Sequence, residues 1–311
     1  MRMANRARLV SGEARLAARR HLPRVEAKQL EARAQAGARA ASTATGPLDV
    51  TCIVFSKDRA MQLEACLRTI EQNAPYRGPI IVIYLATAPD FSQAYESFAM
   101  TDRIRMVSQS DDFRRDICDA VHAAERYTVF HTDDDFFFRP SAVRPVPTDD
   151  FACFSLRLGE NTTYSYPLDR KQRVPPAIAA QSVIAWDWTR AEGDFAYPMS
   201  VNGHIFETGL VQTMLRGARF SNPNELEHEL HLRRYRAQPL MLSPRKSCVV
   251  SVPVNAVSRT RNRRGQNRHY SPAALNARFL AGERIDFGAM DFSDVHGAHQ
   301  EVPLVFTTDR G

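Results

Sequence analysis

Apolar and polar positions follow two alternating periodicities from about residue 48 onward. Short apolar runs rich in β-branched residues predict buried strands, and between them apolar residues recur three or four positions apart, as in an amphipathic helix. The predicted strands cover residues 49–55, 78–87, 103–109 and 126–135, and the predicted helices cover residues 56–75, 89–100 and 110–125. Because the strands are apolar throughout and alternate with helices, the pattern predicts an α/β domain with a Rossmann-like, mostly parallel sheet and helices on both faces.

The order of the predicted elements becomes mixed after residue 140. We expect a strand at 149–159, a long loop at 161–182, turns and short strands at 183–206, and a helix at 221–236. The chain has no internal repeat and no second break in composition, so residues 47–311 are expected to form a single domain. In such sheets ligands bind beyond the carboxyl ends of the strands, where residues 141–311 would close the crevice.

Residues 1–46 have a different composition, rich in Ala and Arg. They contain ten Arg or Lys and three Glu, a net charge of +7, whereas the whole chain carries +6, so the remainder is about −1. We expect a solvated basic tail, helical or disordered, and the alternative is a basic helix that contacts a membrane surface or a partner protein. A body without excess positive charge argues against nucleic acid as a partner.

The cysteines and the apolar segments bear on the compartment. Five cysteines are scattered singly, with no C-x-x-C pair, which argues against a zinc knuckle and a disulfide framework. No stretch of about 18 apolar residues exists, and the N-terminus lacks the apolar block of a signal peptide. We therefore expect a cytoplasmic protein, with peripheral attachment to a membrane left open by the basic tail.

Three consecutive aspartates end the fourth predicted strand, in "YTVFHTDDDFFFRP" (residues 127–140). Successive side chains of a strand point to opposite faces, so Asp133 and Asp135 are expected on one side and Asp134 on the other. Two carboxylates side by side suit a hard divalent cation, Mg²⁺ or Mn²⁺, which prefers oxygen ligands. The structural alternative is that the aspartates cap the next segment or pair with Arg139.

The segment "TCIVFSKDRAMQLEACLRTIEQNAP" (residues 51–75), followed by "HTDDD" after a fourth strand, resembles the nucleotide-sugar half of GT-A-type glycosyltransferases. The likeness is to family 2 enzymes and to the C-terminal domain of exostosins, and it covers residues 48–140 well and 141–311 loosely. It implies a metal-dependent glycosyltransferase of the hexosyltransferase type, with residues 47–140 as the nucleotide-binding half. The implied donor is a nucleotide-diphosphate sugar, with UDP expected, and the implied acceptor is a saccharide or a lipid-linked glycan.

The resemblance also assigns roles to residues. The first aspartate of the motif, Asp133, would lie near the ribose, with Asp134 beside it, and Asp135 would bind the metal that bridges the diphosphate. A histidine near the C-terminus often joins the metal ligands of this family, and His299 in "DVHGAHQEVP" is the candidate, in preference to His296. The turn after the first strand would line the uridine pocket, and a basic residue in the helix before the motif would reach the diphosphate; these residues are Ser56, Lys57, Asp58 and Arg59, and Arg114 or Arg115.

An inverting transferase needs a carboxylate that takes the proton of the acceptor hydroxyl. The segment "SNPNELEHEL" (residues 221–230) offers Glu225 and Glu227, and Asp187 between two tryptophans is a third candidate. Glu225 also stands at the third helical position after Asn222, the position of a capping box, which explains it structurally. Glu225 and Glu227 are preferred to Asp187, and the sequence does not choose between the two glutamates.

Two other regions are candidates for the crevice. The turn "SVNGHIF" (residues 200–206) would lie near the acceptor, with Gly203 permitting a close backbone approach. The basic stretch 257–270 would be a lid over the diphosphate or a solvated loop. Two rival functions are a sugar-1-phosphate nucleotidylyltransferase, disfavoured because "FSKDRAMQ" lacks glycine, and a non-catalytic nucleotide- or carbohydrate-binding protein of related fold.

Overall fold

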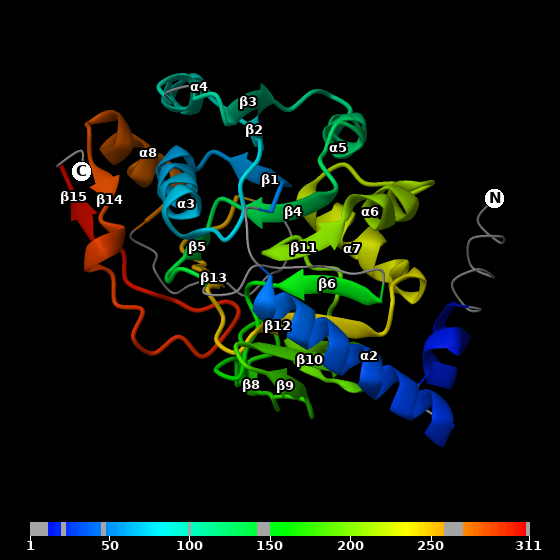
Figure 1. Ribbon diagram of the computed structural model, residues 1–311. Helices are drawn as coiled ribbons and strands as arrows, with labels where there is room; N and C mark the ends of the chain where they lie inside the picture. The colour runs from blue at the N-terminus through cyan, green and yellow to red at the C-terminus, as the bar shows by residue number, and fades with distance from the viewer. Residues whose placement is uncertain are drawn as a thin grey trace.

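The computed structural model describes residues 12–19, 23–44, 48–98, 101–141, 150–257 and 270–308. A nine-stranded sheet runs through the middle of the molecule (Figure 1). From one edge to the other its strands are β3 (Ile104–Ser108), β2 (Ile80–Leu85), β1 (Val50–Lys57), β4 (Tyr127–Thr132), β11 (His204–Glu207), β6 (Phe151–Ser155), β12 (Leu240–Pro244), β10 (Val183–Asp187) and β9 (Ile178–Ala180). Strands β11 and β10 run antiparallel to their neighbours, and the others share one direction. The predicted mostly parallel sheet of a single α/β domain is confirmed.

Helices cover both faces of the sheet, as predicted. One face carries α2 (Arg24–Thr43), α3 (Ala60–Asn73), α4 (Pro89–Glu96) and α8 (Pro272–Leu280), and the other carries α5 (Phe113–His122), α6 (Thr208–Leu215) and α7 (Pro223–Leu232). Strand β1 shows why two layers form: Cys52 and Val54 point into the core on the first face, and Ile53 and Phe55 into the core on the second. A strand that is apolar on both faces can only be buried between two layers of helices.

Smaller elements complete the second half of the chain. Two-stranded pairs are formed by β5 (Asp135–Phe137) with β13 (Val249–Ser251), β7 (Tyr164–Ser165) with β8 (Arg170–Lys171), and β14 (Arg284–Ile285) with β15 (Phe306–Thr307). Single 3-10 turns are η1 (Trp188–Arg190), η2 (Gly193–Ala196), η3 (Arg234–Arg236) and η4 (Phe287–Ala289). The long loop expected at 161–182 therefore contains β7, β8 and β9 instead of being irregular throughout.

The N-terminal helix α2 lies along the sheet over β10 and β9 (Figure 1). Its buried residues Ala34, Gly37, Ala38 and Ala41 recur at helical spacing and have little or no side chain, so the helix backbone approaches the sheet closely. The sequence analysis favoured a solvated tail, helical or disordered, for residues 1–46; residues 24–43 are helical, and the helix packs on the sheet instead of being solvated all round. That helix is packed and not free, because small side chains can form a tight contact without being conspicuously apolar.

No helix within the described ranges combines the length and the apolar character that a membrane crossing needs.

The contact between Gly37 and Phe151 can be tested by substitution. A Cβ atom at Gly37 would lie 2.2 Å from the Phe151 ring, so Gly37→Val should lower the free energy of unfolding by about 1–3 kcal/mol. Denaturant unfolding measures this, and Ala36→Val, on the exposed face of the same helix, is the matched control because it changes only helix propensity. Equal losses in the two variants would show that α2 does not pack on the sheet through Gly37.

Candidate functional site

The three aspartates lie where β4 ends at the carboxyl edge of the parallel strands. Strand β4 stops at Thr132, Asp133 and Asp134 form a turn, and β5 begins at Asp135. The expected alternation of side chains along one continuous strand does not apply across a turn. As a result Asp133 and Asp134 face a common partner, and Asp135 faces a different set of residues.

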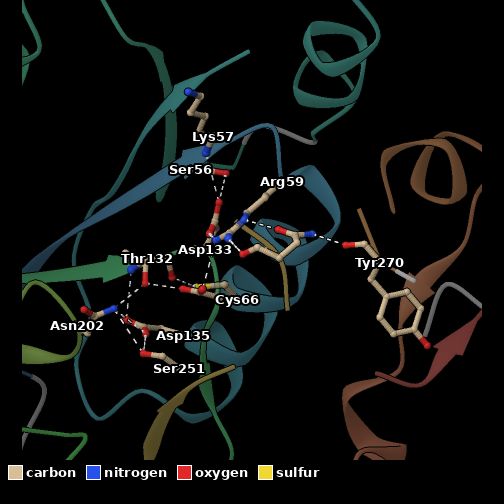
Figure 2. A network of polar contacts seen from close by, with 12 residues as sticks. Ser56, Lys57, Arg59, Cys66, Thr132, Asp133, Asp135, Asn202, Ser251 and Tyr270 are labelled. Atoms are coloured by element: carbon tan, nitrogen blue, oxygen red, sulfur yellow. Dashed lines mark hydrogen bonds and ion pairs between the residues drawn. The ribbon is translucent and has the colours of Figure 1, made fainter. Parts of the chain in front are cut away.

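The common partner is Arg59, in the turn after β1. One guanidinium nitrogen, Nη1, lies 2.9 Å from Asp133 Oδ1 and 3.2 Å from Asp134 Oδ2 (Figure 2). The side chains of Arg59, Asp133 and Asp134 are only 10%, 3% and 17% exposed. Ion pairs this far removed from water are much stronger than those on a surface, because the surroundings screen them less.

The turn that carries Arg59 is itself fixed by hydrogen bonds. Asp58 has a φ of 53°, and its carboxylate accepts hydrogen bonds from the backbone N–H and the hydroxyl of Thr87, both at 2.8 Å. The backbone N–H of Arg59 donates to the Tyr95 hydroxyl at 3.0 Å. The Arg59 Nε donates to the side-chain oxygen of Asn255 at 2.8 Å, and Nη2 donates to the backbone oxygen of the same residue. Asp58 thus shapes the turn, and Arg59 is held in place from two sides.

Ser56 and Lys57 bind the other oxygen of Asp133. The Ser56 hydroxyl lies 2.9 Å from Asp133 Oδ2 and 2.7 Å from the Tyr95 hydroxyl, and the backbone N–H of Lys57 donates to the same carboxylate oxygen at 3.3 Å. The Lys57 side chain points away from the aspartates (Figure 2). The structure therefore brings the predicted turn 56–59 against the predicted aspartates.

Asp135 is fully buried and is surrounded by donors. One oxygen lies 3.0 Å from His131 Nδ1 and 3.2 Å from the backbone N–H of Thr132, and the other accepts from Asn202 at 3.1 Å and from the Ser251 hydroxyl. These partners come from β4, the turn before β11, and β13, so several segments of the chain meet at this carboxylate (Figure 2).

His131 links Asp135 to the core behind it. Its Nε2 lies 3.1 Å from the hydroxyl of Tyr76, a buried residue that follows α3 in the chain. A neutral imidazole that donates from Nδ1 to Asp135 can accept from Tyr76 at Nε2, so one tautomer satisfies both contacts. The Asp135 carboxylate is thus anchored to the interior of the protein and does not face solvent.

The three carboxyl groups differ in acidity because their surroundings differ. Burial raises the pKa of Asp133 to about 6 and also raises the pKa of Asp134, and the positive charge of Arg59 offsets only part of this. Burial would raise the pKa of Asp135 as well, but the hydrogen bonds from His131, Ser251 and Asn202 outweigh it and leave that pKa below its usual value. Asp135 is therefore a stable anion, and the other two share one guanidinium.

The predicted pair of metal ligands, Asp135 and His299, does not fit a cation in this arrangement. Both oxygens of Asp135 accept protein hydrogen bonds, and the Nδ1 of His299 lies 3.3 Å from a guanidinium nitrogen of Arg157. Burial lowers the pKa of His299 to about 3, and Arg157 adds to this. Within the described ranges no three His, Cys, Asp or Glu side chains are grouped so that they could hold a metal ion.

The three candidate bases have different surroundings. Glu225 is exposed, and its backbone N–H donates to the side chain of the N-cap residue Asn222, as a capping box predicts, but its carboxylate accepts from the backbone and hydroxyl of Ser221, one residue before the N-cap. Asp187 caps η1 by accepting from the backbone and hydroxyl of Thr189. Both carboxylates therefore have structural roles at the start of a helical turn.

Glu227 points instead toward the turn that holds Asn202. Its carboxylate accepts from the Ser200 hydroxyl at 3.0 Å and from the backbone N–H of Val201 at 3.1 Å. The backbone N–H of Asn202 donates to Ser200 at 3.3 Å, and the Asn202 side chain donates to Asp135. A continuous chain of hydrogen bonds thus joins Glu227 to the three aspartates at residues 133–135, called here the aspartate turn.

Burial raises the pKa of Glu227, and the backbone hydrogen bond from Val201 and the charge of Arg157 offset part of the change. Arg157 is buried, and it donates to Ser200 at 2.6 Å. A partly buried carboxylate with a raised pKa is a better proton acceptor than an exposed one.

Two predicted diphosphate ligands lie elsewhere. Arg114 donates to the backbone oxygen of Ala218 at 2.8 Å, on the face of the sheet covered by α5 and α6, and Arg115 is exposed on the same helix. The basic stretch 258–269 falls outside the described residues.

Sequence reasoning missed several residues of the site. Tyr95, Asn255, Ser251, Arg157 and His131 were not singled out, and most of them come from distant segments with no local signal. His131 lay within the motif "HTDDD" and Asn202 within "SVNGHIF". The only signal that could have identified His131 was its place two residues before the aspartates.

Comparison with known proteins adds little. No protein-family model and no curated protein matches the sequence. Among the solved structures with a weak likeness to this chain are S. aureus TarS, with a TM-score of 0.39 and 10% identity over 63% of this chain, and S. aureus TarS 1-349, with a TM-score of 0.40 and 12% identity over 66%. The match spans 35% of the first of those chains and 60% of the second. A likeness at this level assigns neither a family nor an activity.

The difference between Asp135 and Asp134 can be tested by stability measurements. Asp135→Asn replaces an acceptor with an N–H₂ group amid donors, and we expect a loss of about 3–5 kcal/mol in the free energy of unfolding. Asp134→Asn, at the more exposed neighbour, should change it by about 1 kcal/mol or less, because it also removes a carboxylate from the pair. Urea unfolding of both variants decides, and a similar small change in each would contradict the anchoring role of Asp135.

The raised pKa of Asp133 predicts a pH dependence. Between the unfolded value near 4 and the folded value of about 6, the folded protein binds a proton that the unfolded chain has lost, so this group makes stability fall as pH rises through that window. Asp133→Asn should remove this dependence. The difference in the free energy of unfolding between the variant and wild type should therefore change by roughly 2–3 kcal/mol from pH 4 to pH 7. Urea unfolding at several pH values, with exposed Asp102→Asn as the control, measures it. Parallel curves for wild type and Asp133→Asn would refute the prediction.

Proposed function

We propose that the chain is a glycosyltransferase that transfers a sugar from a nucleotide-diphosphate donor, with UDP as the expected nucleotide, to a saccharide or lipid-linked acceptor. The observation that carries the proposal is the meeting of the turn after β1 with the turn after β4, through Arg59, Asp133 and Asp134. In open α/β sheets this edge, beyond the carboxyl ends of adjacent parallel strands, is where ligands bind.

The groups needed for sugar transfer lie around this edge. The acceptor hydroxyl oxygen forms a bond to the anomeric carbon, the bond from that carbon to the diphosphate breaks, and the hydroxyl proton passes to a base. Glu227 is the base in this proposal, because of the three candidate carboxylates it alone is linked to the aspartate turn. Its raised pKa favours acceptance of the proton.

The divalent cation stays a prediction that the arrangement of donors does not favour. Every oxygen of Asp133, Asp134 and Asp135 accepts at least one protein hydrogen bond, so no step of the proposed reaction is routed through a metal. Contact of the N-terminal region with a membrane also stays a prediction.

The donor can be identified by calorimetric titration of UDP, and then of a panel of UDP-sugars, into the full-length protein. We expect saturable binding of UDP, and the affinities measured for the UDP-sugars would rank the donors. Failure of UDP and of all the UDP-sugars to bind, with or without Mn²⁺, would refute the proposed function.

The base can be tested by comparing two glutamates of one helix. Glu227→Gln should lower the rate of UDP release from the preferred UDP-sugar, with a glycan panel as acceptors, by about 100- to 10,000-fold, and should leave UDP binding unchanged. Glu225→Gln is the matched control, because that side chain caps the helix, and it should retain the rate. Equal rates in the two variants would remove Glu227 from the mechanism.

A further inference from the structure

We propose that the guanidinium of Arg59 takes the place of a divalent cation at the aspartate turn, so that the protein binds a nucleoside diphosphate without a metal. This inference rests on the proposed function, since it concerns which group neutralises the negative charge of the diphosphate at the same donor site. It assigns Arg59 a role different from the uridine contact that the sequence suggested.

The first argument is the position of the guanidinium. Nη1 of Arg59 lies between Asp133 Oδ1 and Asp134 Oδ2, at 2.9 and 3.2 Å, where two carboxylate oxygens from different residues converge. A pair of carboxylates arranged in this way is an attractive position for a cation. A metal ion could occupy that point only if Arg59 left it, because the two positive charges would overlap in space and repel each other.

The second argument is that Arg59 is fixed there. Asn255 binds both Nε and Nη2 of the guanidinium, and Tyr95 binds the backbone N–H of Arg59. A surface arginine normally loses much side-chain entropy when it binds a ligand, whereas one that is already held pays little. If Arg59 moved away to admit a metal ion, its hydrogen bonds to Asn255 would be broken.

The third argument is that the remaining carboxylate oxygens are also engaged. Asp133 Oδ2 accepts from Ser56 and from the Lys57 backbone, and Asp134 Oδ1 accepts from the Thr132 hydroxyl at 2.7 Å. Mg²⁺ demands near-ideal octahedral geometry and usually takes one or two carboxylates that are free to adjust. A cation at this turn would have to displace several protein donors at once.

The last argument concerns what Arg59 can offer a ligand. Its contacts with Asp133, Asp134 and Asn255 use four of the five N–H groups of a guanidinium, so among the described residues one N–H on Nη2 is left for a ligand. Arginine binds phosphate oxygens strongly through such charge-assisted hydrogen bonds. Arg59 itself belongs to the turn 56–59, and in this proposal a diphosphate bound at that turn accepts a hydrogen bond from the remaining N–H.

The test is calorimetric titration of UDP into wild type and Arg59→Ala, each in EDTA and in Mn²⁺. Wild type should bind UDP in EDTA with an affinity within a few-fold of that in Mn²⁺. Arg59→Ala should lose about 10- to 100-fold in EDTA, and Mn²⁺ should restore part of the loss, because the vacated oxygens of Asp133 and Asp134 can then hold the ion. Arg105→Ala, at an exposed position of β3, is the matched control and should bind as wild type does.

The outcomes separate the two proposals. Binding by wild type only when Mn²⁺ is present would overturn the role of Arg59 and leave the proposed function standing, as would full affinity of Arg59→Ala in EDTA. No binding of UDP or of any UDP-sugar under either condition would refute both. If Arg59→Ala does not fold, Arg59→Lys keeps the charge without the planar fork, and it should weaken binding in EDTA by about tenfold; unchanged affinity would overturn the role.

Discussion

Three adjacent carboxylates are withdrawn from water at the end of β4, and the cost of burying them is the constraint on which the site depends. An ionised carboxylate is stable in the interior only where donors and opposite charges replace its hydration. The turn after β1 supplies Ser56 and Arg59 to one aspartate, and Asn202 and Ser251 reach the third from later parts of the chain. The sheet, the turns and the C-terminal segments are therefore placed as partners of one cluster of negative charge.

The same constraint separates the functions of the aspartates. Asp135 is wholly enclosed and its oxygens accept hydrogen bonds from several segments, whereas Asp133 and Asp134, whose side chains are 3% and 17% exposed, share a single arginine. Alternation along one continuous strand would instead group Asp133 with Asp135 and set Asp134 apart. Their division follows from the turn at Asp133 and Asp134, which separates β4, in the nine-stranded sheet, from β5, which pairs with β13 in another sheet.

The sequence was most informative where the physics is local. The four parallel strands β3, β2, β1 and β4 and the helices between them follow from apolar periodicity, and the capping box at Glu225 follows from residue spacing. The aspartates and the turn 56–59 were rightly expected at one edge, because carboxyl ends of parallel strands meet there. The roles assigned to these residues are untested.

Non-local features were not accessible in this way. The insertion of β11 between β4 and β6, the packing of α2 on β10 and the contact of Asn255 with Arg59 join segments far apart in the chain. No pattern within a window of twenty residues encodes such a pairing. Arg114 or Arg115 was expected to reach the diphosphate because of its place in a helix, and only the three-dimensional arrangement shows that Arg114 donates to Ala218.

The set of contacts around Asp135 has a consequence for how the protein can be divided. Ser251 is separated from Asp135 by 116 positions and Asn202 by 67. Two of the hydrogen bonds that stabilise this carboxylate of the first half are therefore donated by the second half. Residues 47–140 cut out alone would leave a buried charge without two of its donors. The first half therefore depends on the second half for the burial of this charge.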